Sequence, residues 1–407
     1  MTGTSFAIGI VGKPSAGKTS FTNAACFTDF KVGSYPFTTI DPNFGVAYVR
    51  HECVCKEFGV KDDPQNSICI DGIRHIPVKI IDVAGLVPDA WQGRGLGNKF
   101  LNDLSTADVL IHVVDISGSL DEEGRPVSPG SHDPIEDVLF LEREINQWML
   151  DIVKRDWRKI TGRMRAEHAK FEVLLAEKFA GLAINKTHIL KALRLANLNS
   201  DVADKWSDEE LEKFIDALRR VSKQIIIAAN KIDMHTSEEN LKRLKERFPD
   251  LTIIPTCSLC EYILKDFDKK GIISYIPGDN DFKILKPEKL SEKELGALEK
   301  IRTNILQKYG STGVQKILET AVFDVLDMIT VYPVNDPTSL TDSKGRVLPD
   351  VYLVKNGTTT REFAGLIHTD LAKSFLYAID VRTKMRLGEK HVLKDRDVIK
   401  IVSTKGT

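Results

Sequence analysis

Four residues near the middle of the chain, Asn230-Lys231-Ile232-Asp233, have side chains that can recognise a guanine base. They follow an apolar run, residues 224–229, that predicts a buried parallel strand. An aspartate at this strand end can accept hydrogen bonds from the N1–H and 2-amino groups of guanine. Adenine offers neither donor, so a buried Asp233 would be left unpaired against it. Asn230 can bond the base edge, and the stem of Lys231 can lie along the ring. Taken alone, the four residues are more typical of a helix cap after a strand.

A second motif, close to the N-terminus, has the spacing of a phosphate-binding loop. The apolar run 6–11 predicts a strand that leads directly into Gly12-Lys13-Pro14-Ser15-Ala16-Gly17-Lys18-Thr19, a match to G-x-x-x-x-G-K-[ST]. The glycines let successive backbone N–H groups point at a β-phosphate. We expect Lys18 to reach the β- and γ-phosphates and Thr19 to ligate Mg²⁺. A helix starting near Lys18 favours the anion, and Ser20 in its first turn completes the predicted nucleotide-binding set.

Two further segments follow in the order expected of a nucleotide switch. In residues 35–40 a threonine can close on Mg²⁺ and the γ-phosphate, and the apolar strand 76–81 ends in Asp82-Val83-Ala84-Gly85. We expect Asp82 to hold Mg²⁺ through water and the Gly85 N–H to contact the γ-phosphate. Each segment alone is equally typical of an ordinary turn. Together the four motifs predict a switch that binds GTP and GDP with Mg²⁺.

The residue after Gly85 bears on catalysis. Many small GTPases have a glutamine there that orients the attacking water. This chain has Leu86, which cannot hydrogen-bond water. We therefore expect slow turnover unless another group or a partner positions the water.

The motifs together resemble a known protein family. Residues 12–19, 35–43 and 82–88 are similar to the Obg superfamily of GTPases, and residues 93–101 narrow the resemblance to the archaeal form of the YchF subfamily. Residues 348–355 and 367–371 resemble a TGS domain, and the likeness covers about residues 6 to 404. The resemblance implies that Thr39, rather than Thr38, is the switch I magnesium ligand, and that Thr39 and Gly85 act with Lys18 in catalysis. Asn230 and Asp233 favour GTP over the ATP that some relatives prefer.

Three positions depart from the family pattern. Ser15 replaces a phosphate-loop asparagine that is associated with potassium-assisted hydrolysis, so potassium stimulation is not implied. Cys257-Ser258 stands where a fifth motif usually reads Ser-Ala, and its contact with the guanine O6 comes from backbone N–H, which the replacement preserves. Asp89 stands where relatives have glycine.

Composition indicates a globular protein. The 407 residues are 42% hydrophobic and 28% charged with a formal net charge of −1, and no apolar run reaches the length of a membrane span. With no basic stretch or cleavage site at the N-terminus, we expect a cytoplasmic protein, and we expect a monomer. Six cysteines fit a reducing compartment without disulfides. Zinc binding by Cys53, Cys55 and Cys69, or by Cys257 and Cys260, is the alternative, although neither set gives two well-spaced ligand pairs.

The motifs predict an α/β fold: a P-loop NTPase G domain with an inserted helical subdomain and a C-terminal β-grasp (TGS) domain. About 90 residues separate the predicted fourth and fifth core strands, too many for an ordinary connection. We assign 1–134 and 223–327 to the G domain, 135–222 to the insertion and 328–407 to the TGS domain. In the TGS domain we expect strands at 351–354, 377–382 and 398–402, and a helix at 363–375 after a capping box formed by Thr359 and Glu362.

Two basic surfaces could contact a partner, but the sequence does not identify that partner. One face of the predicted insertion helix is basic, and the TGS domain has a second basic edge. Each is either a solvated surface or a contact for ribosomal RNA phosphates. The first function we consider is a GTP-hydrolysing switch associated with the ribosome or translation. The second is a guanine-nucleotide sensor with incidental hydrolysis, and the third is an ATPase, which conflicts with Asp233. The basic residues are Lys154, Arg155, Arg158, Lys159, Arg163, Arg165 and Lys170 in the insertion, and Arg382, Lys384, Arg386 and Lys390 in the TGS domain.

Overall fold

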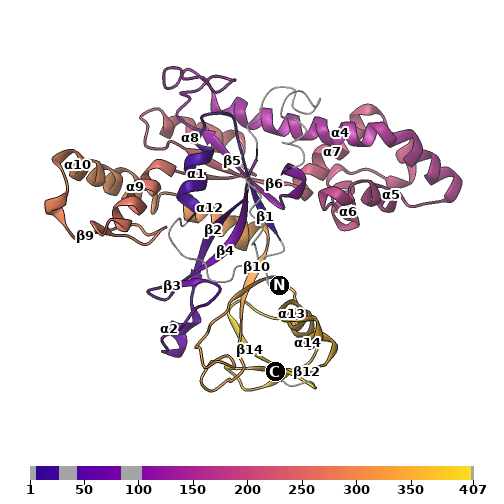
Figure 1. Cartoon of the computed structure of the whole chain (residues 1–407). Coiled ribbons are helices and arrows are strands. Elements are labelled where there is room, and N and C mark those ends of the chain that lie inside the picture. Colours follow the sequence, from indigo (N-terminus) through magenta and orange to yellow (C-terminus); the bar gives the residue numbers. More distant parts are fainter. Residues whose placement is uncertain (1–5, 27–43, 84–102, 405–407) are drawn as a thin grey trace. The chain divides into compact units, whose positions relative to one another are not determined.

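A computed structural model describes residues 6–26, 44–83 and 103–404 (Figure 1). The chain divides into two compact units, which are described separately. The first contains residues 1–6, 25–79 and 318–407, and the second contains residues 7–24 and 80–317. Among the described residues, no helix combines the length and apolar character needed to cross a membrane.

The second unit is built on parallel strands in the order β1 (Ala7–Val11), β5 (Val109–Asp115), β6 (Gln224–Asn230) and β7 (Thr252–Pro255). The last residues of β4 (Ile73–Asp82) lie beside β1, where Val83 N donates to Ile10 O at 3.1 Å. β1 and β5 are buried along their whole length, as continuous apolar strands of a covered parallel sheet must be. The carboxyl ends of these strands therefore meet at one edge, where α/β proteins bind ligands.

The helical insertion begins with α4 (Pro134–Glu167), a 34-residue helix. Asp133 caps it by accepting from Ile135 N, and Pro134 takes the first helical position. It is followed by α5 (Phe171–Lys178), η2 (Ala180–Leu182), α6 (Lys186–Ala196), η3 (Ser200–Lys205) and α7 (Asp208–Ser222), which pack beside α4 and one another (Figure 1). Four aromatic rings with centroids 5.3–6.2 Å apart form its core: Trp157, Phe171, Trp206 and Phe214.

The remaining elements of the second unit alternate with or follow the strands. They are α1 (Lys18–Ala25), α8 (Ser237–Arg247), α9 (Ser258–Lys269), the short pair β8 (Ile273–Ser274) and β9 (Lys283–Ile284), η4 (Pro287–Lys289), α10 (Glu292–Ile301), the π-helical η5 (Arg302–Leu306), α11 (Gln307–Tyr309) and α12 (Val314–Glu319). A strand followed by a helix, repeated across a parallel sheet, is the arrangement expected of a P-loop NTPase.

The first unit includes a hairpin from the N-terminal half of the chain. It consists of β2 (Phe44–Glu52), the short helix α2 (Val54–Phe58), β3 (Ile68–Ile70) and the first part of β4, with β3 antiparallel to β4. Between α2 and β3 runs the loop 59–67, which hydrogen-bonds the C-terminal segment 347–351. Asp63 N donates to Val347 O (2.8 Å) and Gln65 N donates to Pro349 O (2.7 Å). The Asn66 side chain pairs with the backbone N–H and C=O of Val351.

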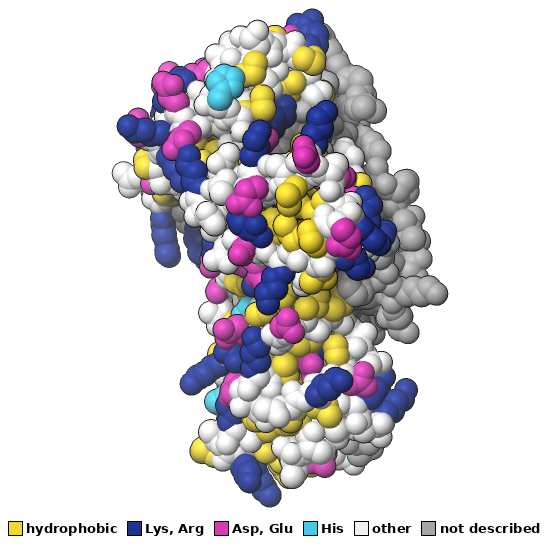
Figure 2. All heavy atoms as spheres, turned by 90° about the vertical axis from the view of Figure 1, so that its left-hand side faces the viewer, with side chains coloured by type: hydrophobic (Ala, Val, Ile, Leu, Met, Phe, Trp, Pro, Cys, Tyr) yellow, Lys and Arg dark blue, Asp and Glu magenta, His cyan; other side chains and the backbone are white. Residues whose placement is uncertain are grey.

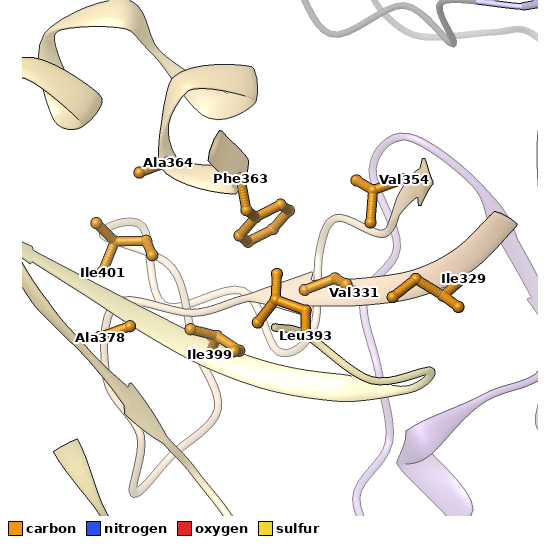
Figure 3. Close-up of a cluster of buried hydrophobic side chains, with 9 residues drawn as sticks. All are labelled: Ile329, Val331, Val354, Phe363, Ala364, Ala378, Leu393, Ile399 and Ile401. Carbon is orange, nitrogen blue, oxygen red and sulfur yellow. The ribbon is translucent and has the colours of Figure 1, made fainter. Parts of the chain in front are cut away.

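The C-terminal part of the first unit is a five-stranded sheet in the order β11 (Tyr352–Lys355), β10 (Met328–Pro333), β14 (Asp397–Ser403), β12 (Phe375–Asp380) and β13 (Arg386–Leu387). The π-helical η6 (Thr320–Val325) precedes it. Phe363 on α13 (Thr360–Ile367) points toward the sheet and belongs to a buried hydrophobic cluster between the helix and the sheet (Figure 3). The cluster comprises Ile329, Val331, Val354, Phe363, Ala364, Ala378, Leu393, Ile399 and Ile401. One helix packed on a mixed sheet is the β-grasp arrangement that the sequence predicted.

The predicted helix 363–375 is wrong in its bounds. The capping box of Thr359 and Glu362 is confirmed, but α13 starts at Thr360 and ends at Ile367. His368 has extended backbone and caps a second helix, α14 (Thr369–Lys373), by accepting from Asp370 N. Phe375 already belongs to β12. The helical periodicity continued across His368 because both short helices place apolar residues on the same sheet.

Candidate nucleotide-binding site

The phosphate loop lies between β1 and α1. Its backbone has positive φ at Gly12 (150°), Ser15 (62°) and Gly17 (101°). A Cβ on Gly12 would lie 2.4 Å from Val113 O, and a Cβ on Gly17 would lie 2.3 Å from Asn230 Nδ2, so both positions need glycine. Ser15 adopts the left-handed region that asparagine, the usual family residue there, enters more readily. This curled backbone has the form of a loop whose N–H groups converge on an anion.

Lys18 begins α1 and is held over the same loop. Its Nζ donates to Gly12 O (2.8 Å) and Lys13 O (2.9 Å). Burial lowers the pKa of the Lys18 ammonium, and the charge of Asp82 at the end of β4 partly counteracts that shift. Thr19 and Ser20 are exposed in the first turn of α1. A hydroxyl and a carboxylate beside the loop are oxygen ligands of the kind that Mg²⁺ prefers, so Thr19 and Asp82 fit the predicted metal.

Asn230, the last residue of β6, connects the phosphate loop to the fifth motif. Its Nδ2 donates to Ala16 O at 2.9 Å. Its Oδ1 accepts from Ser258 N (3.1 Å) and Ser258 Oγ (2.9 Å). Asn230 is 4% exposed, so these bonds replace nearly all the hydrogen bonds that its amide would make to water. The side chain that the sequence assigned to the base edge therefore also holds two nucleotide-binding loops at a fixed separation.

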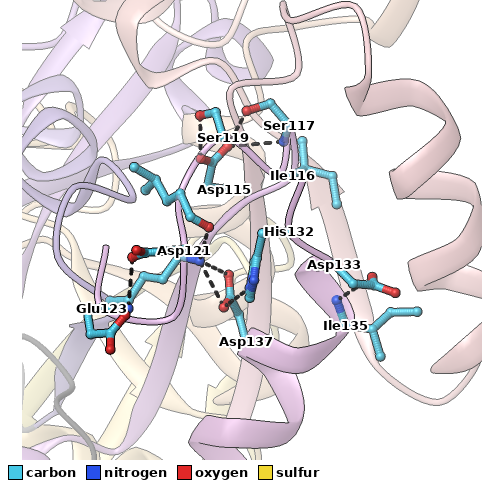
Figure 4. A network of polar contacts seen from close by, with 12 residues as sticks. Asp115, Ile116, Ser117, Ser119, Asp121, Glu123, His132, Asp133, Ile135 and Asp137 are labelled. Atoms are coloured by element: carbon cyan, nitrogen blue, oxygen red, sulfur yellow. Dashed lines mark hydrogen bonds and ion pairs between the residues drawn. The ribbon is translucent and has the colours of Figure 1, made fainter. Parts of the chain in front are cut away.

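Lys231 is held in place by a carboxylate that the sequence analysis missed. Asp115 ends β5 and pairs in register with Asn230 of β6. Its carboxylate accepts from Lys231 Nζ (2.9 Å), Ser117 Oγ (2.5 Å) and Ser119 Oγ (2.7 Å), and Figure 4 shows both serines turned toward it. Burial raises the pKa of Asp115, but these hydrogen bonds outweigh it and hold the pKa below its ordinary value. The signal in the sequence was an aspartate at the end of the neighbouring strand.

Asp233 differs from the prediction in one respect. We expected a buried carboxylate, but Asp233 is exposed and Ile232 is the buried residue of this turn. The turn directs alternate side chains to opposite sides, and the apolar one faces the core. A bound base would itself cover the Asp233 carboxylate. The energetic cost of binding adenine would then arise because the covered carboxylate has no donor to pair with.

The expectation of a chain without disulfides is wrong. Cys257 and Cys260 are joined by a disulfide, with Cα atoms 5.2 Å apart. The two residues lie three positions apart at the start of α9, where one helical turn brings their sulfurs within bonding reach. Cys257 Sγ lies 3.4 Å from Asp233 Oδ1, a contact in which a disulfide sulfur has no proton to donate. The fifth motif is thus cross-linked to its own helix beside the base-recognition residue.

Lys13 has a different role from its neighbours in the loop. Its buried Nζ forms an ion pair with Asp137 of α4 (2.8 Å) and donates to Leu120 O (3.1 Å). His132 also bonds Asp137 at 2.8 Å, a contact visible in Figure 4. Burial raises the pKa of Asp137 despite these partners. Only the backbone of Lys13 is therefore available to a nucleotide, while its side chain joins the phosphate loop to the first turn of the helical insertion.

Several predicted site residues lie outside the described residues. They include the switch residues Thr38, Thr39, Gly85 and Leu86, and Asp89 together with residues 93–101. The structure brings together Gly12–Ser20, Asp82, Asn230–Asp233, Cys257 and Ser258 at the carboxyl ends of β1, β4, β6 and β7. The catalytic roles of Thr39 and Gly85 stay predictions.

The basic face of α4 is largely neutralised. Lys154 pairs with Asp208, Arg155 with Asp151, and Arg165 with Asp204, while Arg163 contacts both Glu167 and Glu177. Within the described part of the chain, Arg158, Lys159 and Lys170 have no carboxylate within 4.0 Å. Figure 2 shows the same mixture of acidic and basic side chains on another face. Paired charges favour the interpretation of a solvated surface for most of α4.

The basic edge of the C-terminal domain is also partly engaged. Arg382 binds Glu57 of α2 through two nitrogens, and Arg396 contacts Glu52 and Glu57. Arg386 lies over the ring of Tyr377. Arg382 therefore has a structural partner, which the prediction of an RNA-contacting edge did not anticipate.

Three family descriptions match the chain. "50S ribosome-binding GTPase" matches residues 7–151, "Obg-like GTPase YGR210-like, G4 motif-containing domain" matches residues 228–336, and "TGS domain" matches residues 341–403. The first covers the phosphate loop, the second covers the base-recognition motif and β10, and the third covers the other strands of the β-grasp sheet. The expected G domain and TGS domain are confirmed.

Relatives match over nearly the whole length. An uncharacterized GTP-binding protein of Methanocaldococcus jannaschii is 47% identical over 97% of this chain and 98% of its own. A protein of Mycoplasma pneumoniae named ribosome-binding ATPase YchF is 26% identical over 90% of this chain and 87% of its own. The crystal structure of a GTP-binding protein from Pyrococcus horikoshii aligns with a TM-score of 0.77 at 39% identity, covering 98% of this chain and all of that one. The YchF GTPase structure of Schizosaccharomyces pombe, at 20% identity and a TM-score of 0.59 over 99% of both chains, shares the fold.

Proposed function

Because this chain belongs to the YchF subfamily of Obg-like GTP-binding proteins, we propose that it is a Mg²⁺-dependent GTPase switch whose nucleotide state controls association with the ribosome. The observation that carries the proposal is Asn230, whose amide bonds Ala16 of the phosphate loop and Ser258 of the fifth motif. A P-loop hydrolase with a base-reading motif joined directly to its phosphate loop can respond to the base and to the phosphates as one unit.

In this proposal each residue acts at a defined place. The backbone of Gly12–Thr19 and the Lys18 ammonium bind the β- and γ-phosphates, and Thr19, Thr39 and Asp82 hold Mg²⁺, which neutralises developing phosphate charge when bound. Asp233 accepts from guanine, Lys231 is positioned along the ring by Asp115, and the Cys257–Ser258 backbone faces the O6. The Gly85 N–H contacts the γ-phosphate.

Slow intrinsic turnover is part of the proposal. Leu86 offers no hydrogen bond to the attacking water, so we place the intrinsic rate well below about 1 s⁻¹. The ribosome enters through the names of relatives such as the Mycoplasma protein, and a cytoplasmic location follows from such a partner. We further propose that the protein is a monomer. Its domains in this proposal are the G domain (1–134 and 223–327), the helical insertion (135–222) and the TGS domain (328–407).

The second candidate is a guanine-nucleotide sensor whose hydrolysis is incidental, and Leu86 is the residue that favours it. Single-turnover GTP hydrolysis with and without ribosomes separates the two. A switch is accelerated by its partner, whereas a sensor binds the partner at an unchanged hydrolysis rate. An ATPase, which the names of some relatives suggest, conflicts with the presence of both Asn230 and Asp233.

The hydrolytic proposal is tested by removing the phosphate-loop cation and the metal ligand. Lys18→Ala and Thr19→Ala should each abolish Mg²⁺-dependent GTP hydrolysis, because Lys18 contacts the transferred phosphoryl group and Thr19 holds the Mg²⁺. Lys242→Ala, an exposed lysine of α8 outside the site, is the matched control and should hydrolyse GTP at the wild-type rate. Phosphate release in single-turnover reactions with Mg²⁺ or with EDTA gives the readout. Wild-type hydrolysis by Lys18→Ala would exclude this site as the catalytic centre.

A further inference from the structure

Three thiols and one carboxylate meet in the first unit, between the two predicted switch segments in the sequence. They are Cys53, Cys55, Asp62 and Cys69, and we call them the thiol cluster. One ligand atom from each lies within 4.8 Å of the corresponding atoms of the other three. Cys53 caps α2, Cys55 lies in its first turn, Asp62 belongs to the loop after it, and Cys69 is the middle residue of β3. The proposed nucleotide site uses none of them.

Two distances within the thiol cluster match those of a tetrahedral zinc site. Cys55 Sγ and Cys69 Sγ are 3.8 Å apart, and Cys53 Sγ lies 3.3 Å from Asp62 Oδ2. Zinc–sulfur bonds of about 2.3 Å and zinc–oxygen bonds of about 2.0 Å give tetrahedral edges of about 3.8 Å between sulfurs and about 3.5 Å between sulfur and oxygen. Two of the six donor–donor distances therefore match the edges of a tetrahedral site, and the other four are within 4.8 Å.

Arg74 supplies the surroundings that such a site needs. It is fully buried, and its NH2 lies 3.3 Å from Asp62 Oδ2 and donates to Leu348 O at 2.7 Å. Among the described residues its Nε has no hydrogen-bond partner. Three thiolates and a carboxylate around a divalent ion leave a net charge of −2, which the guanidinium reduces to −1. An outer residue that orients a ligating carboxylate in this way is a regular feature of metal sites.

We propose that the thiol cluster is a structural zinc site. Binding replaces the thiol protons of Cys53, Cys55 and Cys69, which pass to solvent, by bonds to Zn²⁺, with Asp62 as the fourth ligand. A site closed by four protein ligands has no open position for chemistry, so its role is to hold structure. The spacing, Cys-x-Cys-x₆-Asp-x₆-Cys, places all four ligands within 17 consecutive residues.

The structure to be held is the loop 59–67. It has no regular secondary structure except the left-handed cap of α2 at Gly59, yet its backbone bonds Val347 and Pro349, and its Asn66 side chain bonds Val351. Asp62 lies in this loop directly before Asp63, whose N–H makes the first of these bonds. The ion therefore fixes the loop that joins the hairpin to the TGS segment 347–351.

Metal binding by the full-length, reduced protein tests the proposal. Anaerobic titration of the metal-free protein with Co²⁺ should give one tightly bound ion per chain, with thiolate charge-transfer bands and the intense visible bands of tetrahedral cobalt. Zn²⁺ should bleach both sets of bands. The bands should be absent from Cys69→Ser and weakened or shifted in Asp62→Asn. Cys26→Ser, which changes a cysteine outside the thiol cluster, is the matched control and should keep the full signal.

Folding of the variants is checked independently. The phosphate loop and the base-recognition motif belong to the other unit, so Cys69→Ser should bind GTP with unchanged affinity while hydrogen exchange at the Val351 amide accelerates. Absence of bound metal in the wild type, or unaltered cobalt spectra in Cys69→Ser, would overturn the proposal. A Cys55–Cys69 disulfide that leaves those thiols untitratable in the protein as purified would overturn it as well.

Discussion

At the scale of residues, Asn230 is central because its side chain joins the phosphate loop to the fifth motif. Removing its side chain leaves Ala16 O and the Ser258 donors without their partner. A buried polar group left without a partner costs about 1–3 kcal/mol, so the loss falls on the geometry of both loops.

We expect Asn230→Ala to weaken GTP binding at least about tenfold. The matched control is Asn240→Ala, which removes another buried asparagine that bonds Ile116 O and touches neither loop. Both variants should lose some thermal stability, but only the first should lose affinity. Fluorescence titration with a labelled guanine nucleotide measures this. Equal affinity losses would mean that Asn230 acts through stability alone.

Site residues could be predicted from the sequence where their motif lies within a few consecutive residues. The phosphate loop and Asn230-Lys231-Ile232-Asp233 can be recognised in the sequence because their functional side chains lie in consecutive residues. Asp115 cannot, because it acquires Lys231 as a partner only when β5 and β6 pair in space. Cys257 and Cys260 were assessed from the compartment that the cysteine content suggested, whereas their Cα separation is a property of the start of α9.

At the scale of elements, the contact of β2 with the TGS domain has a pH dependence that can be measured. Asp395 accepts hydrogen bonds from Thr330 and pairs with His51 Nε2 at 3.2 Å. Burial raises the pKa of Asp395, but the bonds from His51 and Thr330 outweigh it and lower the pKa to about 2, from 3.8. A carboxyl whose pKa is lower in the folded state stabilises the protein above its unfolded pKa. That contribution is lost as pH falls.

We therefore expect the wild type to lose stability relative to Asp395→Asn as pH falls from about 4 to about 2, the interval between the two pKa values. Urea unfolding followed by circular dichroism at several pH values gives the difference between the two proteins. Other carboxylates titrate in the same range, but they do so in both proteins and cancel. A constant difference across this range would show that Asp395 does not contribute through its charge.

Helices and strands could be predicted from the sequence where a residue pattern is typical of only one kind of secondary structure. The strands β1, β5, β6 and β14 follow apolar runs, and α13 follows its capping box. The break at His368 and the strand β10 were not anticipated, because the first interrupts a continuing apolar period and the second belongs to a sheet completed by β14, more than 60 residues later.

At the scale of the whole molecule, the basic face of α4 makes a quantitative prediction. If unpaired cations contact ribosomal RNA, each lost contact lowers the salt dependence of binding, as the slope of log K against log salt, by about 0.7–0.9. We expect Arg158→Glu with Lys159→Glu to reduce that slope by about 1.4–1.8 without changing GTP affinity. Arg163→Glu with Arg165→Glu is the matched pair, since both arginines are already neutralised by carboxylates.

Co-sedimentation with ribosomes over a salt series decides between the two interpretations of this surface. A larger effect from the Arg158 and Lys159 pair supports contact with phosphates. Unaltered co-sedimentation in both double variants would leave α4 as a solvated surface.

The central claim is that this site selects guanine, and competition between nucleotides tests it most directly. Displacement of a labelled guanine nucleotide by unlabelled GTP, ATP or XTP, with Mg²⁺ present, should show GTP binding at least about tenfold more tightly than ATP, since adenine leaves Asp233 without its donors. Asp233→Asn should shift the preference toward XTP, because the acceptor facing the 2-position becomes a donor. Equal affinities for GTP and ATP in the wild type, or undiminished guanine preference in Asp233→Asn, would contradict the account.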